Sequence, residues 1–82
     1  MTYEEWQATR KWHDDLIEAL PHVRDHFEEP ETVQGYAYDF GCWIAYLGGT
    51  YWTIAGRGEL SGDLDTVERF LWDEHAKYEA AP

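Results

Sequence analysis

The sequence is poor in cysteine and in basic residues, and each shortage removes a class of function. Cys42 is the single cysteine, which excludes an intrachain disulfide framework and a four-cysteine zinc site. A chain without disulfides fits a reducing compartment, so we expect a cytoplasmic protein. Lysine and arginine together number 6 against 17 acidic residues, and the formal net charge is −11. This charge disfavours binding to nucleic acid or to an anionic membrane and favours a basic partner.

Long apolar runs are also missing. No stretch approaches the roughly 20 apolar residues that span a bilayer. The N-terminal sequence MTYEEWQATR has no apolar core of the kind found in secretory signal peptides. With 82 residues, we expect a single domain over residues 1–82 that is too small for a buried catalytic cleft. Five tryptophans, six tyrosines and three phenylalanines can supply its core.

The stretch 36–54 predicts an antiparallel hairpin. Gly48-Gly49 lies between two β-rich runs and is a strong signal for a two-residue turn. This turn pairs Leu47 with Thr50, Ala45 with Trp52, and Trp43 with Ile54. Because side chains alternate across a strand, one face carries the mostly apolar set Trp43, Ala45, Leu47, Trp52 and Ile54, which we assign to the core. The other face carries Cys42, Ile44, Tyr46, Tyr51, Thr53 and Ala55.

A second turn around Phe40-Gly41 would add a strand over residues 33–38. A two-residue turn there places Tyr36 and Tyr38 on the Trp43 face. A three-residue loop is the alternative, and the sequence leaves both open. The sheet is therefore expected to be antiparallel, with two to three strands.

The flanking segments read as helices. Thr2 and Glu5 have capping-box spacing, so a helix is expected to start near Tyr3 and to end or kink at Pro21. A short second helix over residues 22–29 would direct Val23 and Phe27 inward. The buried stripe of the first helix is expected to consist of Trp6, Thr9, His13, Leu16, Ile17 and Leu20.

A third helix is expected to follow, with Asp65 as its N-cap and Glu68 directed away from its buried face. Val67, Phe70, Leu71 and Tyr78 would form that face. The expected fold is α+β: an N-terminal helix kinked or split at Pro21, an antiparallel sheet, and a C-terminal helix packed on the Trp43 face.

No catalytic, cofactor-binding or metal site emerges, and we expect a chain that is not an enzyme. His22 and His26 have i, i+4 spacing, with Asp25 or Glu29 as a possible oxygen ligand, but the HExxH pattern is absent and no third nitrogen or sulfur ligand is fixed. Surface histidines are the simpler interpretation. Cys42 lies in a short predicted strand without a neighbouring base, which indicates a structural thiol.

Two surfaces remain as candidate binding sites. The first is Tyr46 and Tyr51, predicted to be cross-strand neighbours beside Ile44 on the outer sheet face. These three residues could form a protein-interaction patch or a homodimer interface.

The second candidate is acidic. Carboxylates three or four residues apart on a helix offer spacings of roughly 5 to 6 Å, comparable with the phosphate spacing along a nucleic acid strand. An acidic face of this kind could occupy a basic nucleic-acid-binding groove. The residues assigned to this surface are Asp14, Asp15, Glu18, Asp25, Glu28, Glu29, Glu31, Asp73 and Glu74.

The layout resembles a known class of proteins. An aromatic-rich hairpin, an acidic glycine-rich loop and an acidic helix containing Trp72-Asp73-Glu74 follow one another over roughly residues 33 to 80. This order is similar to that of small acidic phage anti-CRISPR proteins of type I systems that act as DNA mimics. The resemblance implies a phage-encoded inhibitor in the host cytoplasm, with a CRISPR surveillance complex as its partner. Arg10-Lys11 departs from a continuous acidic surface.

Overall fold

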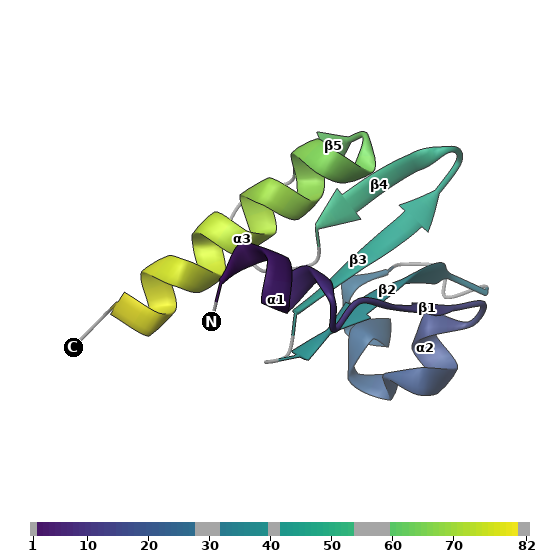
Figure 1. The fold of residues 1–82 in the computed structure, drawn as a ribbon. Coiled ribbons are helices and arrows are strands. Elements are labelled where there is room, and N and C mark those ends of the chain that lie inside the picture. The colour runs from purple at the N-terminus through teal and green to yellow at the C-terminus, as the bar shows by residue number, and fades with distance from the viewer. Residues whose placement is uncertain (1, 28–31, 40–41, 54–59, 81–82) are drawn as a thin grey trace.

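The computed structural model describes residues 2–27, 32–39, 42–53 and 60–80, with side chains as far as Lys77 (Figure 1). Its sheet has five strands in the order β1-β2-β3-β4-β5, and every neighbouring pair is antiparallel. The α+β class is confirmed, whereas two to three strands understates the sheet. The elements in chain order are α1 (Tyr3–Gln7), β1 (Lys11–His13), α2 (Leu16–Ala19), the 3₁₀ helix η1 (Pro21–His26), β2 (Gln34–Tyr38), β3 (Cys42–Leu47), β4 (Thr50–Thr53), β5 (Ser61–Gly62) and α3 (Leu64–Ala80).

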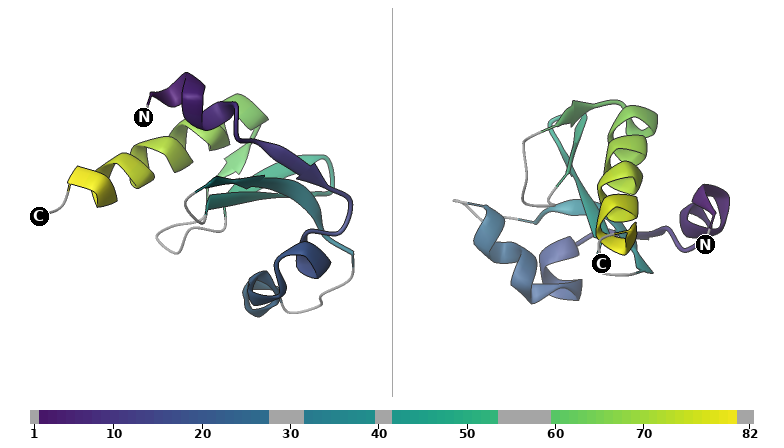
Figure 2. Two further views of the ribbon diagram at one scale, coloured as in Figure 1. Left: turned by 60° about the horizontal axis from the view of Figure 1, so that its bottom comes forward. Right: turned by 90° about the vertical axis from the view of Figure 1, so that its left-hand side faces the viewer.

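The sheet is the middle of three layers. Figure 2 shows α1 and α3 on one face of the sheet and α2 with η1 on the other. Two hydrophobic clusters correspond to these two interfaces. Trp6, Tyr38, Ile44, Val67 and Leu71 form the cluster on the α1/α3 side. Leu16, Ile17, Val23, Val33 and Ala45 form the cluster on the α2/η1 side.

The prediction of one N-terminal helix as far as Pro21 is wrong, although its start is right. The Thr2 hydroxyl accepts the Glu5 N–H and the Glu5 carboxylate accepts the Thr2 N–H, both at 3.1 Å, so the capping box is present. The helix nevertheless ends at Gln7, and β1 follows. Residues of the expected stripe separate: Trp6 packs on one sheet face and Leu16 on the other. Pairing of β1 with β2 therefore overrides the helical pattern.

Pro21 acts as predicted. Helix α2 ends at Ala19, and Leu20 has the non-helical dihedrals φ −133° and ψ 78°. The segment after it is a 3₁₀ helix that ends at His26, not an α-helix to residue 29. Val23 is fully buried and Phe27 packs against the same cluster, which confirms this inward pair.

The Gly48-Gly49 hairpin is confirmed. Leu47 pairs with Thr50 and Ala45 with Trp52, and both glycines have positive φ, 59° and 82°. The pairing of Trp43 with Ile54 lies outside the described residues. The register is thus the one that a two-residue loop imposes.

The connection between β2 and β3 follows the three-residue alternative. Tyr38 pairs with Cys42 and Tyr36 with Ile44, so both tyrosines lie on the Ile44 face. The two-residue turn, which placed them on the Trp43 face, is wrong. A shift of one residue in register exchanges the two faces of a strand.

The C-terminal helix packs on the face opposite to the predicted one. Ile44 and Ala45 are both 0% exposed, so each face of β3 is covered. Helix α3 covers Ile44 through Val67 and Leu71, and α2 with η1 covers the face of Ala45 and Trp43. Gly35 allows this second contact, because a Cβ there would meet the Ile44 carbonyl oxygen and lie 2.9 Å from Leu16 Cδ2.

Asp63, not Asp65, caps α3: its carboxylate accepts the Thr66 N–H at 2.8 Å. Asp65 is exposed in the first turn. Among the helices of the described part of the chain, none combines the length and the hydropathy that a membrane span requires.

Candidate functional site

Four aromatic side chains form a continuous cluster on the α1/α3 face of the sheet. Trp12, Tyr36, Tyr46 and Tyr51 come from β1, β2, β3 and β4, and we call them the aromatic platform. Their rings form a closed circuit, in which each contacts two others. The centroids lie 4.8 Å apart for Trp12–Tyr36, 6.3 Å for Tyr36–Tyr51, 4.9 Å for Tyr51–Tyr46 and 6.1 Å for Tyr46–Trp12.

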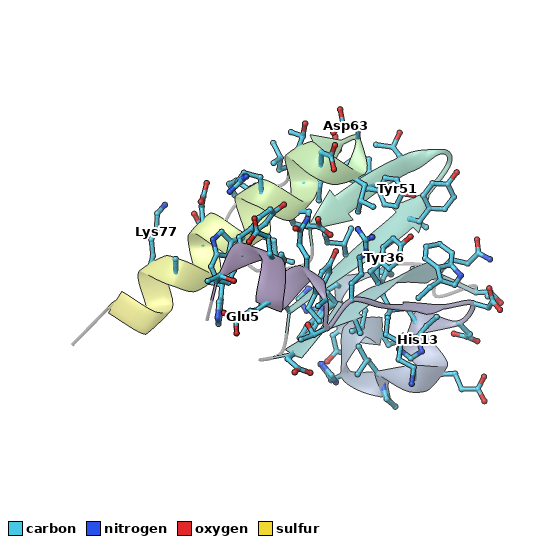
Figure 3. The ribbon with its side chains drawn as sticks, in the orientation of Figure 1. Glu5, His13, Tyr36, Tyr51, Asp63 and Lys77 are labelled. Atoms are coloured by element: carbon cyan, nitrogen blue, oxygen red, sulfur yellow. The ribbon has the colours of Figure 1, made fainter. Side chains whose placement is uncertain are left out.

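The strand register explains why these rings meet. Trp12 is paired with Tyr36, and Tyr46 with Tyr51, so the four side chains share one face. On the same face, the Cys42 end of β3 lies among residues of α1 and α3, whereas Tyr46 lies toward the other end. Trp12 is 37% exposed and the three tyrosines are partly exposed. Figure 3 shows Tyr36 and Tyr51 over the sheet, well away from Lys77 near the end of α3.

The hydroxyls of the platform differ from its indole in their hydrogen bonding. Within the described residues, the hydroxyls of Tyr36, Tyr46 and Tyr51 make no hydrogen bond. Partial burial raises the pKa of Tyr51, with Tyr36 and Tyr46 adding to the effect, so this hydroxyl stays a neutral donor at pH 7. In contrast, the Nε1–H of the Trp12 indole donates to the Asp14 carboxylate at 3.0 Å.

Arg10 borders the platform and connects it to a buried polar network. Its guanidinium lies 5.1 Å from the centre of the Tyr36 ring. The same group donates to the Glu68 carboxylate at 3.1 Å. Glu68 is 0% exposed, so the prediction that it points away from the buried face of α3 is wrong.

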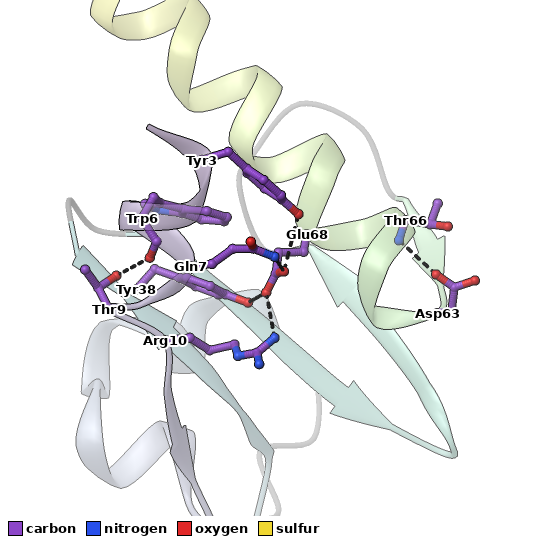
Figure 4. A network of polar contacts seen from close by, with 9 residues as sticks. All are labelled: Tyr3, Trp6, Gln7, Thr9, Arg10, Tyr38, Asp63, Thr66 and Glu68. Atoms are coloured by element: carbon purple, nitrogen blue, oxygen red, sulfur yellow. Dashed lines mark hydrogen bonds and ion pairs between the residues drawn. The ribbon is translucent and has the colours of Figure 1, made fainter. Parts of the chain in front are cut away.

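Glu68 is held by donors from the N-terminal segment and β2 (Figure 4). Tyr38 donates to one carboxylate oxygen at 2.5 Å, and Tyr3 at 3.3 Å and Gln7 donate to the other. Burial, followed by the hydrogen bond to Glu68, strongly raises the pKa of Tyr38. Since both carboxylate oxygens are engaged and closed to solvent, this network serves to hold α1 and β2 against α3.

The acidic residues predicted to bind a partner fall into two groups. Asp15 precedes α2 as its N-cap, Glu18 lies on α2 and Asp25 lies on η1, and we call these three residues the α2–η1 acidic group. Asp73 and Glu74 lie on α3, the helix on the opposite face of the sheet from α2 and η1 (Figure 2). Asp14 follows β1 at the edge of the platform. Glu28, Glu29 and Glu31 lie outside the described residues.

Two of these carboxylates also have structural partners. Asp15 caps α2 by accepting the Glu18 N–H at 2.9 Å. Glu74 forms an ion pair with Lys77 at 2.9 Å. Glu18, Asp25 and Asp73 are exposed, and no ion pair to them is formed within the described residues. The nine residues therefore do not form one continuous surface in the part of the chain that is described.

The predicted placement of the aromatic residues on the sheet is right in part. Tyr46 and Tyr51 are cross-strand neighbours as expected. Ile44 is fully buried under α1 and α3, so the prediction that it lies on an outer surface is wrong. Sequence reasoning missed Trp12 and Tyr36 as members of this surface. The sequence held one local sign against a continuous helix here. The expected helical stripe placed two polar residues, Thr9 and His13, in the core.

The structure also places the histidine pair and Cys42, the other residues considered for chemistry. His22 and His26 are exposed on a 3₁₀ helix, whose three-residue turn does not place i and i+4 on one face. The His22 ring instead packs edge-on against the Trp43 ring, with the two ring centroids 4.7 Å apart. In the described residues, no three His, Cys, Asp or Glu side chains gather as metal ligands would. Burial raises the pKa of Cys42, which disfavours a thiolate nucleophile.

The platform combines large rings, hydroxyls that make no hydrogen bond within the described residues, and a carboxylate at its edge. A family assignment does not accompany it: no family model matches this chain, and no curated protein or solved structure matches it either.

Proposed function

We propose that this chain is a non-enzymatic binding protein for a basic protein partner, and that the aromatic platform is its contact surface. The observation that carries the proposal is the circuit of four partly exposed rings on the open part of the sheet, in a chain of net charge −11.

Ring chemistry supports a protein partner. Tyrosine and tryptophan are enriched at the centres of protein interfaces, because each buries a large apolar area and retains a polar tip. The platform presents three tyrosine hydroxyls that are not used inside the described structure. Those hydroxyls can bond to a partner while the rings lose their contact with water.

Charge supports a basic partner over a second copy. A net charge of −11 attracts a basic surface and accelerates its association at low salt. Two copies meeting at the platform would each carry this charge and repel one another. The homodimer is therefore the weaker form of the interaction-module hypothesis.

A second candidate function, the anti-CRISPR inhibitor suggested by the layout, is favoured by the α2–η1 acidic group. Glu18 and Asp25 are exposed there, and Arg24 is the neighbouring cation. A basic groove could take this group in place of nucleic acid phosphates. Because Asp73 and Glu74 lie on α3, the helix on the opposite face of the sheet, one groove would contact a single group, so the mimicry hypothesis now rests on the α2–η1 side.

One competition experiment compares the two surfaces. A type I CRISPR surveillance complex is bound to labelled target DNA, and the chain is added at increasing concentration. Displacement of DNA supports the inhibitor hypothesis. The double variant Tyr46→Ala/Tyr51→Ala tests the platform, and Glu18→Gln/Asp25→Asn tests the acidic group with little change in side-chain volume.

The outcomes separate the hypotheses. If displacement is lost in the tyrosine variant and kept in the acidic variant, the platform is the contact surface. The reverse result assigns the contact to the α2–η1 acidic group. Absence of displacement at low salt removes the CRISPR hypothesis, and light scattering of the wild-type chain then shows whether the platform joins two copies.

A further inference from the structure

We propose that the corner of the aromatic platform formed by Trp12 and Tyr46, with the Asp14 carboxylate beside it, binds an arginine side chain of the basic partner. This inference rests on the proposed function and specifies the chemistry of its contact surface.

The corner has the two groups that hold a guanidinium. Trp12 and Tyr46 have ring centroids 6.1 Å apart with an angle of 61° between their planes, so their faces are inclined to each other. The Trp12 Nε1–H donates to Asp14 Oδ1 at 3.0 Å, which fixes the carboxylate at the edge of the indole. A cation above the indole face gains a cation–π contact, for which tryptophan is the best ring. Its N–H groups can then reach the carboxylate.

The Trp12 ring and the Asp14 carboxylate are both accessible to an incoming cation. Trp12 is 37% exposed, and Asp14 is also exposed. Within the described residues, no lysine or arginine forms an ion pair with Asp14. The carboxylate thus keeps its charge available, since the side chain that contacts it within the described residues is the neutral indole.

The chain's own arginine determines which part of the platform is open. Arg10 lies over the Tyr36 ring at 5.1 Å and is held there by its ion pair with Glu68. An incoming cation is repelled from Tyr36 and directed toward Trp12 and Tyr46. The same fold already uses this interaction elsewhere, since Arg69 lies 4.0 Å from the centre of the Tyr3 ring.

Arginine fits this corner better than lysine. Its guanidinium is planar, weakly hydrated and able to donate two parallel hydrogen bonds while it lies on a ring. A lysine ammonium is compact and strongly hydrated, and its attraction to Asp14 is that of a point charge. The corner therefore predicts a preference for arginine that a purely electrostatic surface would not show.

The test is an NMR titration of the full ¹⁵N-labelled chain at physiological ionic strength. The probes are a hexapeptide of alternating arginine and glycine and its lysine counterpart, both with blocked ends. We expect the arginine peptide to shift the Trp12 indole N–H signal and to bind about fivefold more tightly than the lysine peptide.

Matched variants separate the corner from general charge. Asp14→Asn and Asp65→Asn remove the same charge from exposed positions, and both folds are checked by the dispersion of the spectrum. Asp14→Asn should abolish the preference for arginine, whereas Asp65→Asn should weaken both peptides equally and keep it. Trp12→Phe retains a ring and loses the indole donor, and it should reduce the preference.

Three results would overturn the inference. If both peptides shift the Trp12 signal with equal affinity, the arginine site is wrong while the proposed platform stands. If Asp14→Asn and Asp65→Asn behave alike, Asp14 has no specific role. If both peptides shift signals of the α2–η1 acidic group alone, the arginine site and the platform both fail as the contact surface.

Discussion

The hydroxyl of Tyr38 donates a 2.5 Å hydrogen bond to the carboxylate of Glu68, joining strand β2 to helix α3 at a point closed to solvent. The Trp6 ring of α1 stacks on the Tyr38 ring with the centroids 4.2 Å apart, so α1 is also held against β2 beside Glu68. Arg10 donates to the same oxygen of the Glu68 carboxylate as Tyr38, and its guanidinium also lies over the Tyr36 ring. Arg10 therefore connects the buried network around Glu68 to the aromatic platform.

Removal of the Glu68 side chain should be strongly destabilising. Glu68→Ala leaves the guanidinium of Arg10 and the hydroxyl of Tyr38 without their acceptor. The Arg10 side chain is 37% exposed and can return to water, whereas the Tyr38 hydroxyl is buried, and a buried hydroxyl left without its acceptor costs about 1–3 kcal/mol in the free energy of unfolding. Urea denaturation measures this loss, with Asp73→Ala, an exposed position on the same helix, as the control. Equal losses in the two variants would contradict a structural role for the network.

Alkaline pH should destabilise the chain partly through Tyr38. Burial raises its pKa in the folded state above the unfolded value of about 10. Below that value both states keep the proton, and the stabilisation is fully present. As the pH rises further, the unfolded state releases the proton first, so unfolding becomes more favourable. Urea denaturation at neutral pH and near pH 11 should show a smaller alkaline loss in Tyr38→Phe than in the wild type. The same loss in both would refute the assignment.

Several local features of the fold could be predicted because they depend on neighbouring residues. The capping box at Thr2 needs one residue type at each of two positions, and the Gly48-Gly49 turn needs two positive φ angles. The break at Pro21 follows from the ring of proline itself. Each of these signals is complete within a few residues, and each was confirmed.

The remaining features depend on contacts between distant segments. Strand β1 exists because Trp12 pairs with Tyr36, which lies far along the chain. The face to which Tyr36 and Tyr38 belong was decided by one residue of loop length. Glu68 is buried because Tyr3, Gln7 and Arg10 surround it, at sequence separations of 58 to 65. The full platform could not be predicted for the same reason.

Gly35 should tolerate no larger residue. A Cβ at this position would clash with the Ile44 carbonyl oxygen and lie 2.9 Å from Leu16 Cδ2. Gly35→Ala must therefore separate α2 from the sheet or distort the β2–β3 pairing. Overpacking of this kind costs roughly 1–3 kcal/mol, to be measured by urea denaturation.

Gly48→Asn provides the control for that substitution. Gly48 has a positive φ of 59°, and apart from its own residue and its two chain neighbours no heavy atom lies within 4 Å of a Cβ placed there. Asparagine tolerates the left-handed conformation better than other residues. A Gly35→Ala variant as stable as Gly48→Asn would show that α2 does not approach the sheet so closely.

The N-cap of α3 can be tested by two substitutions of one residue type. Asp63→Ala removes the acceptor of the Thr66 N–H, and Asp65→Ala removes an exposed carboxylate from the first turn. Thermal unfolding should show a lower midpoint for Asp63→Ala than for Asp65→Ala. The hydrogen bond to Thr66 also lowers the pKa of Asp63. The difference between the unfolding midpoints of the two variants should therefore narrow as the carboxylate is protonated at acidic pH. The opposite order would restore Asp65 as the cap.

Finally, two tryptophans should respond differently to the same substitution if the platform is a binding surface and not part of the core. Trp6 is 0% exposed and stacks on Tyr38, whereas Trp12 is 37% exposed and contacts Tyr36 and Tyr46 at the surface. Trp6→Ala should cost about 3–5 kcal/mol, as expected for a buried ring. Trp12→Ala should cost less than Trp6→Ala, because 37% of Trp12 already faces water; each of its two ring contacts adds about 0.5–1.5 kcal/mol beyond the area it buries. Comparable losses in urea denaturation would mean that the platform exists for stability, and its tyrosine hydroxyls would then need a different explanation.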